Sequence, residues 1–398
     1  MRRTIILGGG TFQPIRNHLS LSAPAFGTTA RILQTLIPDS ELVLTKMADY
    51  KSTLLSNEDV SDYLDKIIED ETIGTIILNI AFCDYKANPI NNISSDFHGD
   101  RLRTEDGDVN ITLTPTEKII KKIRIKRPDI FLIGFKTTTD KSSDEQFKIA
   151  LKMMKSVKCN LLLANDTVTR NNFVLTAEET IYGESIDRMS SLKELAEITI
   201  LRSNLTYNRT DFRKEQSVSI KETPSSFQRV VQFLIDNGGF IENNGNGFTP
   251  GHFCFRNSDT TFLSSQRKAN HNLVFSEGMT SVEVKDDKFI AFGDRKPSVG
   301  ARSQWLILEE NKDYDCIIHT HNPLLPNSNM SIAEQRPYQC GALECAISTL
   351  NNMKYMGDDI KGVYLNKHGA NILFKSSSDP EIIINFIKNN IELGVKVR

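Results

Sequence analysis

The sequence predicts an α/β protein: a parallel sheet with helices on both faces, followed by a second domain of the α+β class. Three observations lead to this expectation. Short apolar runs alternate with helical periodicity up to about residue 200, a polar segment follows, and the remainder mixes short strands with a few helices. Strand-helix alternation is typical of parallel sheets. A chain of 398 residues has room for two or three such domains.

The apolar runs of the first half are expected to be buried strands. They are apolar throughout instead of alternating with polar residues, which is typical of strands covered on both sides. We expect strands at 4–7, 41–44, 75–80, 130–134 and 161–164, with helices near 27–37, 58–70, 116–126 and 143–157. Residues 1–202 are therefore predicted to form a Rossmann-like domain.

The polar stretch 203–224 is predicted to be a linker, and residues 225–398 a second domain. This domain is expected to open with a helix that Ser225 caps, with Gln228 completing a capping box, and that ends at Gly238-Gly239. Further strands are expected at 251–256, 261–263, 281–284, 288–292 and 316–319, helices around 298–310 and 338–352, and a hairpin over 362–374. That mixture predicts an α+β domain with a largely antiparallel sheet.

Composition limits the kinds of partner and compartment. The net charge of −2 shows no basic excess, so neither nucleic acid nor a membrane surface is expected as a partner. No apolar run approaches the roughly 20 residues of a membrane-spanning helix. Six cysteines without a CxxC pair indicate reduced thiols, so we expect a cytoplasmic protein.

Three histidines stand at expected strand ends in the second domain. His319 and His321 follow a buried run, and the period-two alternation of a strand points both to one face, with Cα atoms roughly 7 Å apart. His368 precedes Gly369, which lets backbone pass close to the site. Three imidazoles in this arrangement predict a divalent metal, with zinc expected. The alternative is that His-x-His occurs here by chance.

From about Ser225 onward the chain resembles the class II aldolase/adducin family. The matching segments occur in the family's order: a glycine-rich loop and strand at 248–256, a strand with a small polar end at 262–265, a helix start at 296–298, the His-x-His strand, and a His-Gly turn at 367–369. The resemblance implies a class II aldolase-like domain with His319, His321 and His368 as metal ligands. It also implies that substrate is bound by residues at Gly251, His252, Ser264 and Ser298, and Arg267 is a candidate source of positive charge.

The chain departs from this family at two positions. Where the family reads Pro-Ser-Ser-Glu, this sequence has Pro297-Ser298-Val299-Gly300, so the usual acid/base carboxylate is missing. His252 replaces the family's phosphate-binding asparagine. Glu344, 23 residues after His321 on an expected helix, is near the spacing at which related epimerases and dehydratases place a catalytic acid. We expect it to transfer the proton, the alternative being an ordinary exposed helix glutamate.

The first half resembles phosphopantothenate–cysteine ligase, a synthetase of the coenzyme A pathway that uses CTP or ATP. The resemblance rests on an ordered series: Gly8-Gly9-Gly10-Thr11 after the first strand, and segments at 80–85, 113–119, 133–135 and 164–166. By resemblance the nucleotide-binding residues are Gly9, Gly10, Thr11, Asp84, Arg101, Thr116, Ile119, Phe135, Lys152 and Asn165. Turn and cap roles are the alternative for Asp84 and Asn165.

The loop that performs ligation in that family is altered here. Ser20 stands where the family has an asparagine, and Pro24-Ala25 replaces a Gly-Lys pair. Arg101 replaces a lysine, and because an arginine can hold phosphate bidentately, nucleotide binding is expected to persist. Ligase chemistry is less well supported than binding.

The leading hypothesis is a two-domain metal-dependent enzyme that is expected to be a homo-oligomer. Its second half would act as a lyase, dehydratase or epimerase on a small phosphorylated or acidic hydroxy-carbonyl compound, through a metal-stabilised enediolate, and its first half would bind a nucleotide. Two alternatives stay open. One is a CTP- or ATP-dependent acid–amine ligase with an auxiliary aldolase-like domain, and the other is a non-catalytic adducin-like binding protein.

Overall fold

The computed structural model of the chain divides into two compact units, Met1–Asn204 and Leu205–Arg398. The described residues are 2–16, 18–89, 101–102, 104–205, 210–242, 247–286, 288–334, 338–339, 341–357 and 359–397. Both the α/β and the α+β parts of the expected fold class are confirmed.

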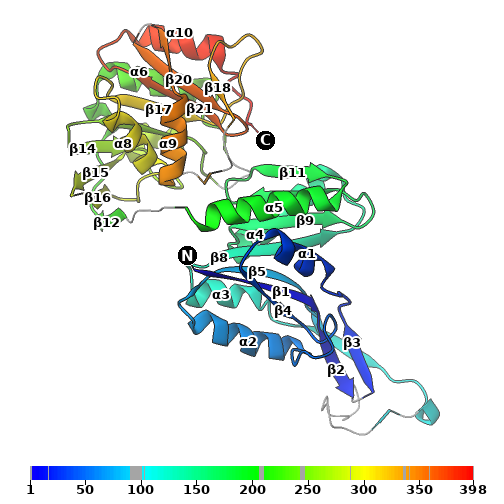
Figure 1. The fold of residues 1–398 in the computed structure, drawn as a ribbon. Coiled ribbons are helices and arrows are strands. Elements are labelled where there is room, and N and C mark those ends of the chain that lie inside the picture. The colour runs from blue at the N-terminus through cyan, green and yellow to red at the C-terminus, as the bar shows by residue number, and fades with distance from the viewer. Residues whose placement is uncertain are drawn as a thin grey trace. The chain divides into compact units, whose positions relative to one another are not determined.

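The first unit is built on a seven-stranded sheet in the order β11-β10-β9-β8-β5-β1-β4 (Figure 1). Its strands are β1 (Arg3–Gly10), β4 (Ser40–Leu44), β5 (Ile73–Ala81), β8 (Phe131–Thr138), β9 (Leu161–Asp166), β10 (Asn172–Thr176) and β11 (Ile181–Ser185). The five strands from β4 to β9 run parallel, while β10 and β11 extend the edge antiparallel. The chain passes from β1 to β4 on one side and then to β5 on the other, so the strand order reverses between β1 and β5. In open α/β sheets ligands bind beside such a switch point, at the carboxyl ends of the strands.

Helices cover both faces of this sheet. On one face lie α2 (Asn57–Glu69), α3 (Ile120–Lys126) and α4 (Ser143–Val157), and on the other α1 (Thr28–Leu36) and α5 (Arg188–Ser203). Capping boxes start two of them, Ser56 with Asp59 for α2 and Ser142 with Glu145 for α4. Two hairpins lie outside the sheet: β2 (Phe12–Arg16) with β3 (Leu19–Ser22), and β6 (Tyr85–Pro89) with β7 (Ile111–Pro115). A short 3-10 turn, η1, spans Thr104–Asp106.

The second unit has a mostly antiparallel sheet in the order β12-β16-β15-β14-β13-β17-β21-β20-β18, with β19 also paired to β20. Its strands are β12 (Thr210–Lys214), β13 (His252–Arg256), β14 (Thr261–Ser264), β15 (Thr280–Lys285), β16 (Lys288–Gly293), β17 (Cys316–Thr320), β18 (Ile332–Ala333), β19 (Lys354–Gly357), β20 (Ile360–Leu365) and β21 (Gly369–Phe374). Among the described strands of this second sheet, parallel pairing occurs only at β12–β16 and β18–β20.

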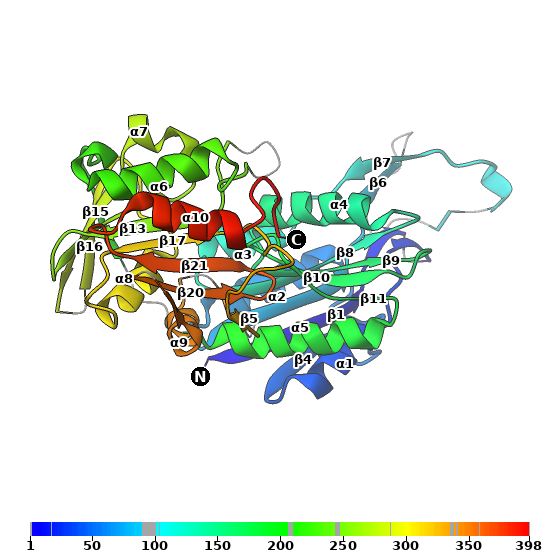
Figure 2. The same cartoon turned by 90° about the horizontal axis from the view of Figure 1, so that it is seen from above.

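The helices of the second unit lie on opposite sides of its sheet, as Figure 2 shows. On one face α6 (Ser225–Asp236) and α10 (Pro380–Asn390) pack on alternate residues of β13, β17 and β21, including Phe253, Ile318 and Ile372. On the other face α8 (Ala301–Glu309) packs against Cys254, Ile317 and Leu373, beside α9 (Leu343–Asn352). The short η2 (Ile220–Glu222), η3 (His271–Leu273) and α7 (Val274–Glu277) complete the unit.

The structure differs from the sequence expectations in three places. The stretch expected as a linker contains β12, which pairs with β16 at the sheet edge, and η2, so most of residues 205–224 are part of the second unit. A polar edge strand has one face in water and therefore lacks the apolar signature of a buried strand. The cap expected at Ser225 is wrong: Pro224 occupies the N-cap, and Gln228 donates to the carbonyl of Thr223. The antiparallel edge β10–β11 and both hairpins were not predicted.

Within the part of the chain that the structure describes, every helix is too short or too polar to cross a membrane.

Candidate functional site

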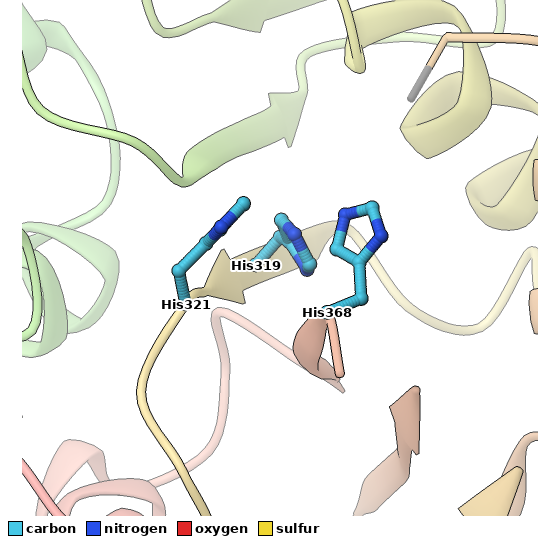
Figure 3. A group of neighbouring side chains, drawn as sticks. All are labelled: His319, His321 and His368. Carbon is cyan, nitrogen blue, oxygen red and sulfur yellow. The ribbon is translucent and has the colours of Figure 1, made fainter. Parts of the chain in front are cut away.

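Three imidazoles meet at one end of the second unit's sheet (Figure 3). His319 is the fourth residue of β17, His321 follows directly after that strand, and His368 lies in the turn between β20 and β21. One ring nitrogen of each lies within 4.8 Å of the others. The ring centroids are 4.8 Å apart for His319–His321, 4.9 Å for His319–His368 and 5.2 Å for His321–His368. The structure therefore brings the three residues predicted as metal ligands into one cluster.

His319 is held in the form that a metal ligand needs. Its Nδ1 lies 3.0 Å from the carbonyl oxygen of Ala370, so this nitrogen carries the proton and donates it. Its Nε2 is buried and has no hydrogen-bond partner among the described residues. A buried polar atom without a partner costs free energy, about 1–3 kcal/mol for a neutral group, so it calls for an explanation. An ion at Nε2, with the carbonyl orienting the other nitrogen, is the arrangement that metal-binding histidines usually show.

The turn that carries His368 is shaped by backbone constraints. Lys367 and Gly369 both have positive φ angles, 58° and 137°, which close the β20–β21 turn tightly. A side chain on Gly369 would overlap the carbonyl oxygen of Thr320 and lie 3.1 Å from the Cα atom of His321. Glycine at this position therefore lets His368 approach the end of β17, as expected of a glycine beside a ligand.

Burial favours the neutral form of two of the three imidazoles. It lowers the pKa of both His319 and His321 well below the usual value, and repulsion from neighbouring histidines lowers both further. Among the described residues no Asp or Glu joins the cluster. Three neutral nitrogen donors fit a borderline ion such as Zn²⁺, and they leave its double positive charge uncompensated.

A fourth histidine, His252, lies beside this cluster. It is the first residue of β13 and stands opposite His319 in the antiparallel pairing of β13 with β17. Their ring centroids are 4.7 Å apart. His252 is 5% exposed, and burial, with smaller contributions from His368 and His271, lowers its pKa to about 3. A Cβ placed on Gly300 would overlap Nε2 of His252 and lie 2.7 Å from its Cδ2. The imidazole therefore fills the space that a side chain at position 300 would need.

Other residues predicted for this site lie around it. Gly251, at φ 93°, packs its backbone against His319, and its carbonyl is 2.9 Å from Nε2 of the buried His271. Ser264 is fully buried, and its hydroxyl donates to the carbonyl of Ser265. Glu344 is half-buried in the first turn of α9 and is not one of the clustered groups. Its predicted catalytic role stays a prediction.

Ser298 and Arg267 line a cavity of about 260 Å³ at the start of α8, the basic cavity. Lys296 and Arg302, which no sequence motif marked, line it with them. The guanidinium of Arg302 lies 4.0 Å from the ring centroid of Phe289, over the aromatic face. Three cationic side chains are thus gathered in a wall that includes Ser298 and Val299. Ser298 and Val299 directly precede Gly300, which packs against the ring of His252.

The first unit has a larger cavity of about 580 Å³ at the carboxyl ends of β5, β8 and β9. We call it the switch-point cavity, because β5 adjoins the reversal of strand order. Four of the predicted nucleotide-binding residues line it: Asp84, Ile119, Phe135 and Asn165. Its wall also includes Gly27 and Thr28 at the start of α1, together with Lys118, Lys136 and Arg188. Lys118 forms a 2.6 Å ion pair with Asp84, while Arg188 donates to the hydroxyl of Thr29.

The glycine-rich segment after β1 lies outside this cavity wall. Thr11 is fully buried, donates to the Asn57 side chain at 2.7 Å and accepts from the amide of Cys83 at 3.0 Å. A side chain on Gly9 would overlap the hydroxyl of Thr45, and one on Gly10 would lie 2.7 Å from the sulfur of Met47. Close packing of neighbouring loops therefore explains these glycines without a phosphate.

Three further predicted residues are also away from the cavity wall. Thr116 uses its hydroxyl to bind the carbonyl of Cys83, and Lys152 and Arg101 are exposed. Sequence reasoning missed Arg188 and Lys136 because basic residues near strand and helix ends carry no motif. Their positions follow only from the strand order.

Comparison with known proteins agrees with the division into two units. Residues 47–196 match the family model described as the DNA/pantothenate metabolism flavoprotein C-terminal domain. The first unit resembles phosphopantothenate–cysteine ligase. Over 91 residues the chain is 32% identical to the coenzyme A biosynthesis bifunctional protein CoaBC of Thermococcus kodakarensis. The aligned residues make up 22% of this chain and 22% of that protein. The match thus spans about a fifth of the length of this curated relative.

Two solved structures are similar to parts of the chain. The DNA/pantothenate metabolism flavoprotein from Streptococcus pneumoniae matches with 20% identity and a TM-score of 0.42, covering 50% of this chain and 97% of that one. An L-fuculose 1-phosphate aldolase matches with 15% identity and a TM-score of 0.32, covering 42% of this chain and 82% of that one.

Proposed function

We propose that the second unit is a divalent-metal site that acts on a small hydroxy-carbonyl compound, phosphorylated or otherwise acidic, by moving a proton next to a carbonyl group. The reaction would be that of a lyase, dehydratase or epimerase. One observation carries the proposal: the buried, unpartnered Nε2 of His319, with Nδ1 committed to the carbonyl of Ala370. This is the donor geometry of a ligand, and His321 and His368 offer their nitrogens within 4.8 Å of it.

A divalent ion held by these residues would act as a Lewis acid, stabilising negative charge on a substrate oxygen. The protein's own contribution is to keep His319 and His321 neutral by burial and to orient His319 through the Ala370 carbonyl. Half-buried Glu344 is the candidate for holding the transferred proton. Arg267, Lys296 and Arg302 in the basic cavity support an anionic substrate, because three cations around one small space favour phosphate or carboxylate.

For the first unit we propose nucleotide binding in the switch-point cavity, with CTP or ATP as the ligand. The cavity volume of about 580 Å³ is within the usual range for small-molecule sites, and it lies where open α/β sheets bind ligands. Phe135 offers an aromatic face, and Lys136 and Arg188 offer positive charge. We do not extend the proposal to ligation, because Pro24 and Ala25 form the part of the wall where the resembled family has its Gly-Lys pair.

Metal analysis is the first test. Purified wild-type protein should carry about one Zn²⁺, Co²⁺ or Mn²⁺ per chain after loading, and His319→Ala should carry none. Loaded wild type should then exchange a substrate C–H for deuterium when given small phosphorylated or carboxylated hydroxy-carbonyl compounds. Equal metal in wild type and variant would refute the site, and bound metal without exchange on any such compound would refute the reaction.

The partners are tested separately. Titration with CTP and ATP should give saturable nucleotide binding in the first unit. Light scattering should give a mass above the 44.9 kDa of one chain if the protein self-associates as expected. Absence of nucleotide binding would refute the proposal for the first unit without affecting the metal site. A mass equal to one chain would refute the expected self-association.

A further inference from the structure

His252 lies against one member of the three-histidine cluster, His319. Its ring centroid is 4.7 Å from that of His319, while the centroids within the cluster are 4.8–5.2 Å apart. His252 therefore adjoins the cluster on the side of His319 and is not one of its three mutually close members.

The direction of the His252 side chain is set by its backbone. His252 pairs with His319 across β13 and β17, and its carbonyl accepts a hydrogen bond from the Gln304 amide on α8 at 3.3 Å. Gly251 before it cannot carry a side chain without meeting the carbonyl oxygen of His319, 2.8 Å from the position of its Cβ. With the strand held on both sides, the ring points to the face of the sheet that carries α8, as do His319 and His321.

The imidazole of His252 is buried. The residue is 5% exposed, and the hydrogen bond that it accepts from Gln304 ends on its backbone carbonyl and not on its ring. A buried imidazole would ordinarily bond a carbonyl or hydroxyl, as His271 does to Gly251 at 2.9 Å. The space that the ring occupies exists because position 300 is glycine. These observations indicate a group placed for a ligand that is not part of the chain.

We propose that His252 is a fourth metal ligand, whose imidazole binds the ion from the side of Gly300. The inference rests on the metal site proposed above. It assigns the ion four nitrogen donors and no carboxylate, a set that suits Zn²⁺, Co²⁺, Ni²⁺ or Cu²⁺ and disfavours Mg²⁺ and Ca²⁺. Four neutral donors also leave the full double charge of the ion, which favours anionic ligands at this site.

The pair His252 and Gly300 allows a double-mutant test with Co²⁺ as the probe. His252→Asn should weaken Co²⁺ binding roughly ten- to hundred-fold or more and change the visible absorption of the bound ion. Gly300→Ala should have a similar effect, because the added methyl group displaces the ring. If both act through the same imidazole, the double variant should bind Co²⁺ no more weakly than the poorer single variant. Gly362→Ala is the matched control: its nearest neighbour would be the flexible end of Met330 at 3.1 Å, and it should bind like wild type.

X-ray absorption on the zinc-loaded wild type tests the same point without any substitution. Scattering from four imidazoles supports the proposal, and three imidazoles with an oxygen overturn it. Unchanged Co²⁺ affinity and spectrum in folded His252→Asn would also overturn it. If wild type binds no metal, the proposed function itself fails, whereas a wild type that binds metal through three histidines removes only His252.

Discussion

Replacing His321 with alanine should remove the metal-dependent stability of the second unit and leave the first unit unchanged. A ligand that binds only the folded state stabilises it by RT ln(1 + [L]/Kd), about 2.7 kcal/mol at 100 times Kd. In a folding unit of roughly 150–250 residues, 1 kcal/mol shifts Tm by about 2–4 °C. Unit Leu205–Arg398 falls in this range, so zinc should raise its Tm by roughly 5–10 °C in the wild type.

The variant should respond much less to the same zinc concentration. With an affinity about 100-fold weaker, the stabilisation falls to about 0.4 kcal/mol, or roughly 1–2 °C. Differential scanning calorimetry with and without zinc measures both shifts. Comparing each protein with its own metal-free form cancels the cost of losing the side chain itself.

Two internal controls make this result interpretable. The transition of the first unit should not move with zinc in either protein. His271→Gln removes another buried histidine of the same unit and keeps a donor toward Gly251, so it should retain the full zinc response. Equal zinc shifts in wild type and His321→Ala would show that the ion binds elsewhere and would refute the argument.

Three further results are expected. Arg188→Met should weaken CTP or ATP binding roughly ten- to hundred-fold, because charge-assisted hydrogen bonds contribute about 1.5–3 kcal/mol. The control variant Lys152→Ala, at an exposed position, should bind the nucleotide normally. A calorimetric titration that finds no difference between the two variants would remove Arg188 from the site. Burial lowers the pKa of His271 to about 4, so the folded state holds the imidazole neutral. The unfolded chain takes up a proton at this histidine below about pH 6.5, so the free energy of unfolding falls as the pH is lowered from about 6.5 toward 4. Metal-free His271→Gln should therefore lose about 2 kcal/mol less than wild type between pH 7 and pH 5 in urea unfolding, and parallel losses would contradict this. Asp166→Ala should lower the urea midpoint of the first unit at least about twice as far as Asp187→Ala. The Asp166 carboxylate accepts hydrogen bonds from the Thr138 hydroxyl and from four backbone amides, those of Asp140, Lys141, Val168 and Thr169, whereas Asp187 caps an exposed helix start. Equal midpoints for the two variants would refute the difference.

The buried strands and the clustering of the three histidines were predictable from sequence because each leaves a local signal. A strand covered on both faces, such as Leu161–Asp166, must be apolar throughout, and alternation along β17 must place His319 and His321 on one face. His368 was predictable from the glycine after it.

The remaining features depend on contacts between distant segments. Nothing local marks β12 as a strand, because it is polar and gains its place only by pairing with β16. The close packing around Gly9 and Gly10 was not predictable for a similar reason, since their neighbours Thr45 and Met47 are far along the chain. His252 was assigned to substrate binding from the loop before it, and its closeness to His319 became visible only through the register of β13 with β17.

The hairpin β20–β21 contributes twice to the candidate metal centre. Its turn carries His368, and the next strand supplies the Ala370 carbonyl that orients His319. During folding, therefore, the centre cannot form before β21 joins β17, although two of its ligands are made earlier in synthesis. Metal uptake would then report that the centre of the sheet has closed, and a chain that stalls before that step would bind ions weakly however well β17 had formed.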